Sequence, residues 1–241
     1  MTFNVLAVIG PDTPPDPLYP VPGDQPNTVE TERGDGTNCT TVPATLIAVY
    51  GVQPGRNRRL ARLLNIKASI HITDQRVAVA CSKFDKGGGF TPLGGLASGA
   101  IALTANTVSK ARASSRRRGK MLVGHVRYPW LLCVGFKEKS GLLSQEVLRL
   151  GLVNPAPGES NALFVDLVIP KNLDSKEIAR SIAQRAAAYQ LADSENLVPE
   201  DRPRLESLVN APPLSGVAGK VTCYWFHDTP PALMAGFQHP Q

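Results

Sequence analysis

Two runs of basic side chains are the residues of this sequence best suited to chemistry, and that chemistry is the binding of phosphate or another anion. One run lies between residues 54 and 62, and the other lies between 109 and 120. An arginine can donate two parallel hydrogen bonds to one phosphate, and clustered cations attract polyanions through salt-dependent forces. The residues predicted to bind the anion are Arg56, Arg58, Arg59, Arg62, Arg112, Arg116, Arg117, Arg118 and Lys120.

Patterns that mark enzymes or metal sites are incomplete in this chain. The three glycines at 87–89 lack the Gly-x-x-Gly that completes a dinucleotide site. Lys120 lacks the Ser or Thr that follows the lysine of a P-loop. Cys223 and His227 are four residues apart, but no second pair of metal ligands accompanies them. We therefore expect a binding protein rather than an enzyme, with no cofactor and no metal.

The composition is that of a folded globular protein with many turns. Of the 241 residues, 42% are hydrophobic and 19% are charged, and the 21 glycines and 21 prolines predict extensive loops. The formal net charge of +6 predicts a polyanionic partner only if the positive charge gathers on one face. Residues 5–9 are too short an apolar stretch for a signal peptide. We expect a cytoplasmic protein that can lie peripherally at a membrane.

Alternating apolar residues predict a mainly β protein with one strong helix. Strands are expected at 2–9, 45–52, 67–73, 77–81, 121–126, 130–137, 144–153, 162–169 and 220–227. The pattern places Trp130, Leu132 and Val134 on one face of their strand. Asp174 followed by Glu177 is typical of a helix start, and the apolar spacing continues that helix to about residue 191. His71 and His125 fall in strands, where a structural role is expected.

The domain organisation follows from the loops. Residues 1–43 form an N-terminal strand with a proline-rich extension, and residues 193–241 form a linker with a C-terminal strand. Between them, residues 44–192 are expected to form one domain that carries a Gly- and Arg-rich insertion at 85–120. Each terminal strand is apolar and set apart by proline-rich sequence, so we expect the two to pair with each other.

Seven strands followed by an amphipathic helix, with the turn Thr73-Asp-Gln-Arg76 after the second strand, resemble the GRAM/PH-like superfamily. The resemblance covers about residues 45–191. It implies a seven-stranded, bent antiparallel barrel whose C-terminal helix closes one end, here with extension strands at both termini. Members of that superfamily bind phosphoinositides, peptides or proteins, so the fold alone does not define the ligand.

In a simple up-and-down meander, the first, third and fifth connections leave the sheet at the same end. Here those connections carry the basic residues at 56–62, those at 110–120, and Lys137 with Lys139. This geometry predicts one basic rim. We expect the rim to contact an anionic membrane surface or an acidic partner protein. A nucleic-acid-binding protein that uses residues 116–118 is the alternative.

Overall fold

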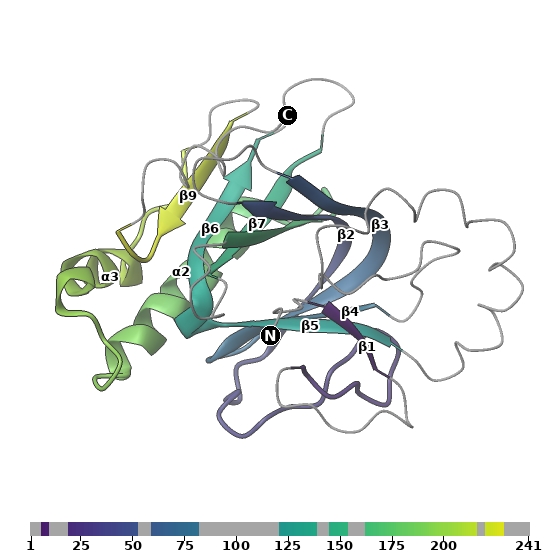
Figure 1. The fold of residues 1–241 in the computed structure, drawn as a ribbon, viewed down its shortest axis with the longest axis horizontal. Helices are drawn as coiled ribbons and strands as arrows, with labels where there is room; N and C mark the ends of the chain where they lie inside the picture. Colours follow the sequence, from purple (N-terminus) through teal and green to yellow (C-terminus); the bar gives the residue numbers. More distant parts are fainter. Residues whose placement is uncertain are drawn as a thin grey trace, which may run out of the picture.

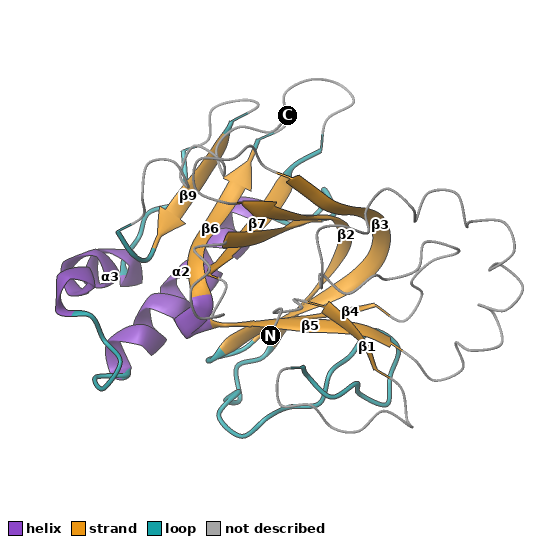
Figure 2. Cartoon of the chain, viewed as in Figure 1, coloured by secondary structure: helices purple, strands orange, loops and turns teal. Residues whose placement is uncertain are grey.

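The computed structural model describes residues 6–9, 19–52, 59–81, 121–138, 145–153, 162–215 and 220–228. These residues form one antiparallel sheet and two helices (Figures 1 and 2). The strands are β1 Leu6–Ile9, β2 Thr40–Val52, β3 Arg59–Ile72, β4 Arg76–Cys81, β5 Met121–Arg127, β6 Leu131–Lys137, β7 Val147–Val153, β8 Ala162–Val168 and β9 Val221–Trp225. The helices are α2 Ser175–Ala192 and α3 Arg202–Val209, with short 3-10 turns η1 Tyr128–Trp130 and η2 Pro199–Asp201.

The sheet is open and has nine strands in the order β1-β5-β4-β3-β2-β8-β7-β6-β9. The long strand β2 joins its two halves, because it pairs with β3 on one side and with β8 on the other. A register shift between Leu46 and Ala48 interrupts both ladders of β2. Such a bulge bends a strand and increases its twist, which suits a sheet that curves around a core. The prediction of a mainly β protein with helices is confirmed.

The core lies between the two halves of the sheet and α2. Leu148, Leu150 and Leu152 of β7 all point into it, as their alternation predicts. The helix contributes a buried stripe that includes Ile182 and Ala186. Asp174 is the N-cap, and its carboxylate accepts hydrogen bonds from the backbone N–H of Lys176 and Glu177. The predicted start of the helix is therefore confirmed in its atomic detail.

The predicted pairing of the two terminal strands is wrong. β1 pairs with β5 and β9 pairs with β6, so the two strands occupy opposite edges of the sheet. Both strands are too short to be stable alone, and each obtains its hydrogen bonds from an existing edge rather than from the other. The same sheet therefore includes strands from both terminal extensions.

Four further differences separate the structure from the sequence prediction. β2 begins at Thr40, inside the segment expected to be a loop, and α3 occupies part of the predicted linker. Leu132 packs in a small cluster with Cys133 and Phe164, apart from the main core that contains Val134. A register shift between Leu131 and Cys133 breaks the alternation, and Trp130 belongs to η1 rather than to a strand.

Candidate functional site

The register of the sheet decides which connections share an end. Val52, the last residue of β2, pairs with Ala162 at the start of β8, and Val153 at the end of β7 pairs with the same residue. The β2–β3 and β7–β8 connections therefore leave from this end of the ladder. At its other end, Val147 of β7 pairs with Val168 of β8, so the β6–β7 connection leaves from there.

This arrangement corrects the predicted rim. The β6–β7 connection, which follows Lys137 and contains Lys139, does not share an end with the β2–β3 connection. In a simple meander of seven strands the first and seventh would run parallel, but β2 and β8 are antiparallel. The chain therefore changes direction relative to the meander between β5 and β6, where η1 forms. Lys137 therefore lies at the other end of the ladder from the β2–β3 connection, and Lys139 falls outside the described residues.

The other two basic connections leave the sheet in the same direction but from different levels of β3, because the β2–β3 connection enters β3 at Arg59, whereas β4 pairs only with residues 69–72 of β3. β4 runs back along β3, and its last residue, Cys81, pairs with Leu122 of β5. The segment 82–120 thus joins the sheet on the side from which β3 starts. Arg59 and Arg62 lie in β3 rather than in the connection, paired with β2. The other predicted anion-binding residues lie in 53–58 and 82–120, outside the described residues.

The excess of positive over negative charge in the chain comes from these two connections. Residues 53–58 contain two basic residues and no acidic one, and residues 82–120 contain eight basic residues and one acidic one. The rest of the chain contains 16 basic and 19 acidic residues. The net charge of +6 is therefore concentrated in two segments of the sequence, and the remainder of the chain is weakly acidic.

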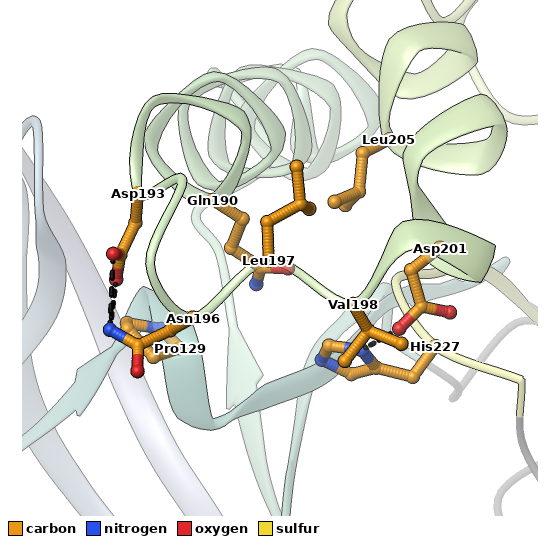
Figure 3. Close-up of a pocket in the computed structure, with 9 residues that line it drawn as sticks. All are labelled: Pro129, Gln190, Asp193, Asn196, Leu197, Val198, Asp201, Leu205 and His227. Carbon is orange, nitrogen blue, oxygen red and sulfur yellow. Dashed lines mark hydrogen bonds and ion pairs between the residues drawn. The ribbon is translucent and has the colours of Figure 1, made fainter.

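A pocket of about 220 Å³ lies apart from these connections. Its walls come from η1, the end of α2, the α2–α3 connection, α3 and the residues that follow β9. Figure 3 shows Asp193 with Asn196 at one end of the pocket and Asp201 with His227 at the other, with Leu197 between them. The residues that line it are Pro129, Gln190, Asp193, Asn196, Leu197, Val198, Asp201, Leu205 and His227.

The polar groups of the pocket are held in place by hydrogen bonds. The side-chain amide of Asn196 donates to both carboxylate oxygens of Asp193 at 3.0 Å. Nδ1 of His227 lies 2.8 Å from Oδ2 of Asp201, and the Arg204 guanidinium donates to the backbone carbonyl of His227 at 2.5 Å. The backbone of the strand end that carries His227 is therefore tied to α3.

An Asp–His pair in a pocket can orient an imidazole as a general base, which would act on a protein nucleophile, on water or on a group of a bound molecule. No serine, threonine or cysteine is among the described residues that line the pocket. In the described part of the chain, no group of three His, Cys, Asp or Glu side chains could hold a metal ion.

A buried arginine organises a second polar cluster. Arg76, in the turn quoted for the family resemblance, is fully buried and forms an ion pair with Asp35 through two contacts, Nε–Oδ1 at 3.0 Å and Nη2–Oδ2 at 2.7 Å. Glu32 bridges Arg76 and Arg127. The turn therefore serves as the docking point for the N-terminal segment 19–38, which the sequence analysis described only as a proline-rich extension.

The backbone turns sharply on both sides of Asp35, and a glycine occupies each of these two positions. Gly34 and Gly36 have φ values of 101° and 71°, which favour glycine. A Cβ at Gly36 would lie 1.8 Å from Oδ2 of Asp74. The N–H of Asp74 in turn donates to the carbonyl oxygen of Asp35 at 3.1 Å. The Gly-Asp-Gly sequence is therefore a close-packed docking element.

The histidines near this cluster are held in the neutral form. Burial, reinforced by the charges of Arg127 and Arg76, lowers the pKa of His125 to about 3. Burial also lowers the pKa of His71, although its Nε2 lies 2.9 Å from the carbonyl oxygen of Asn27. Both side chains are buried, as expected of structural residues.

The pocket and the docking cluster were both missed by sequence reasoning. For the pocket, a signal was present: Pro199 and Pro203 at a helix start, followed by Leu205 and Leu208 at helical spacing, indicate α3. For the docking cluster, no local signal links Asp35 to Arg76, because the two residues are far apart in the sequence.

No protein-family model, curated protein or solved structure matches this chain. Its function therefore has to be argued from its own residues. None of the described helices is long and apolar enough to cross a membrane.

Proposed function

We propose that this chain is a non-catalytic, PH-like binding module that contacts an anionic membrane surface through its basic connections. The order β5-β4-β3-β2-β8-β7-β6 supports the PH-like part of the proposal. Within this order, the first of seven strands pairs with the seventh, and α2 follows the seventh strand directly. α2 packs on β6 and β7, which agrees with a helix that closes one end of a bent barrel.

The observation that carries the binding proposal is the concentration of basic residues in two connections of the sheet. The connections 53–58 and 82–120 together hold ten basic residues and one acidic residue, and we infer that they gather at one end of the sheet. Cations near an anionic surface each contribute about 1 kcal/mol at physiological ionic strength. Several of them at one end are enough to orient and hold a protein at a membrane.

A membrane is favoured over a nucleic acid because apolar residues accompany the charges. Residues 90–103 include leucine, isoleucine, alanine and phenylalanine, and they precede the arginines at 116–118. An apolar segment beside a basic patch suits insertion at the boundary between headgroups and acyl chains. Binding of single-stranded nucleic acid instead relies on aromatic side chains that stack on bases, and the basic connections contain only Phe84 and Phe90.

Binding to vesicles tests this proposal. The protein is mixed with vesicles of phosphatidylcholine alone and with vesicles in which about a third of the lipid is phosphatidylserine, at low and high salt. The variant Arg116→Ala/Arg117→Ala/Arg118→Ala should bind anionic vesicles about 100-fold more weakly, at roughly 1 kcal/mol per charge. The matched control removes three exposed basic residues elsewhere: Lys171→Ala/Arg202→Ala/Lys220→Ala.

The outcomes are distinct. Binding that needs the anionic lipid, weakens with salt and is lost only in the arginine variant supports the proposal. An equal loss in both variants shows a general charge effect and rejects the basic end as the site. Tighter binding to duplex or single-stranded DNA than to anionic vesicles at the same salt replaces the proposal with the nucleic-acid function.

A further inference from the structure

The pocket beside α2 is separate from the basic end. Pro129, which lines the pocket, follows β5, whereas the segment 82–120 enters β5 at Met121. A strand of seven residues rises about 3.4 Å per residue, so the two places are roughly 20 Å apart along β5. A ligand of the pocket therefore does not need the basic connections.

The size and wall of the pocket suit one extended side chain. Its volume of about 220 Å³ is below the range of about 300–1,000 Å³ that is common for small-molecule sites. Leu197, Val198 and Leu205 provide apolar surface, and Val198 is 48% exposed. In the part of the chain that the structure describes, Val21 and Val198 are the large hydrophobic residues that remain exposed. An aliphatic stem that packs on Val198 would cover this surface.

The charge of the pocket selects a cation. Asp193 and Asp201 stand at its two ends, and neither lysine nor arginine is among the described residues that line it. The surrounding segment 193–206 contains five acidic residues and two arginines. A carboxylate can accept about four hydrogen bonds, so Asp193, which accepts two from Asn196, retains capacity for a ligand.

We propose that this pocket binds an arginine side chain of a partner protein. The aliphatic part of the arginine lies against Leu197 and Val198, and the guanidinium donates to the carboxylate of Asp193. Arginine is preferred to lysine because its planar fork matches a carboxylate and because it loses less hydration on burial. The existing Asp201–His227 pair shapes the far end of the pocket and keeps its backbone in place.

A pair of peptides that differ only in charge tests the proposal. The probes are the capped peptide acetyl-Gly-Arg-Gly-amide and its analogue with citrulline, which keeps the shape of arginine and lacks its charge. Binding is followed by the chemical shifts of backbone N–H groups in the full chain. The shifts of Asp193, Asn196 and Val198 should move with the arginine peptide, and the citrulline peptide should bind about fivefold or more weakly.

Two variants test whether the carboxylate of Asp193 is the group that binds the guanidinium. Asp193→Asn should weaken the arginine peptide about fivefold and leave the citrulline peptide unchanged, because it removes charge and keeps shape. Glu195→Gln removes the same charge from an exposed residue outside the lining and is the control. Unchanged spectra elsewhere show that both variants are folded.

Three results would overturn the proposal: equal binding of the two peptides, equal loss in Asp193→Asn and Glu195→Gln, or shifts that map outside the pocket. Self-association of the chain that Asp193→Asn abolishes would also overturn it, because a second copy would then be the occupant. Failure of this test leaves the membrane proposal untouched, since the vesicle variants do not alter the lining of the pocket.

Discussion

Replacement of Asp35 by asparagine should destabilise the protein by about 3 kcal/mol at neutral pH. Arg76 is fully buried, and Asp35 is its two-point partner. Removal of one partner from a buried ion pair costs about 3–5 kcal/mol, because the other charge remains without compensation. We expect the lower part of this range because Glu32 still contacts Arg76 in the variant.

The pH dependence of the effect has a defined sign. Burial alone would raise the pKa of Asp35, but hydrogen bonds from Arg76, from the backbone N–H of Glu32 and from Thr73 outweigh it and lower the pKa from 3.8 to about 2. A carboxyl whose pKa is lower in the folded state stabilises above its unfolded pKa and loses that contribution as pH falls. The shift corresponds to about 2 kcal/mol, lost between about pH 5 and pH 2.

Urea unfolding at several pH values measures both the destabilisation caused by Asp35→Asn and its dependence on pH. The free energy of unfolding should differ by about 3 kcal/mol between the natural protein and Asp35→Asn at pH 7. That difference should narrow by about 2 kcal/mol toward pH 2, because only the natural protein loses the carboxylate. Asp24→Asn, an exposed change in the same segment, is the control and should have no effect. A pH-independent difference, or an equal effect of the two variants, would refute the reasoning.

Three other predictions concern two buried side chains and one glycine with a left-handed backbone. Asp166→Ala should lower the free energy of unfolding in urea by about 3–5 kcal/mol, since it leaves the buried Arg149 without its carboxylate. Gly36→Ala should lower the melting temperature, with a cost of about 2 kcal/mol or more, because the left-handed backbone and the contact with Asp74 both oppose a Cβ. His125 should show no NMR titration midpoint above about pH 5, because burial lowers its pKa to about 3. Since the unfolded histidine protonates near pH 6.5, this residue should also make stability fall as pH drops from about 6.5 toward 3.

Short-range patterns predicted much of the sheet. Alternation in β7 placed its leucines in the core, and Asp174 marked the first turn of α2, because both features depend on residues a few positions apart. The hairpin formed by β3 and β4 was also correct, since the turn at 73–76 joins two apolar runs. These are the parts of the fold in which local geometry determines the structure.

Bulges and long-range pairings limited the prediction. The register shift after Leu131 moved Leu132 out of the main core, and periodicity alone does not reveal an inserted residue. The partners of β1 and β9 depended on which edges were open, a property of the assembled sheet. The docking of Asp35 on Arg76 likewise arises only when the N-terminal segment packs on the hairpin.

The positions of the buried arginines change how the net charge should be interpreted. Arg76 and Arg149 each face a carboxylate inside the fold, so they stabilise the structure and offer nothing to a ligand. With these pairs neutral, the positive excess remains in 53–58 and 82–120, and the segment around the pocket is acidic. Because the pocket and the entry of 82–120 lie toward opposite ends of β5, an anionic surface would attract one end of the molecule and repel the other. If the basic connections contact a membrane as we propose, the same electrostatic asymmetry would direct the pocket away from it, where an arginine of a second protein could reach it.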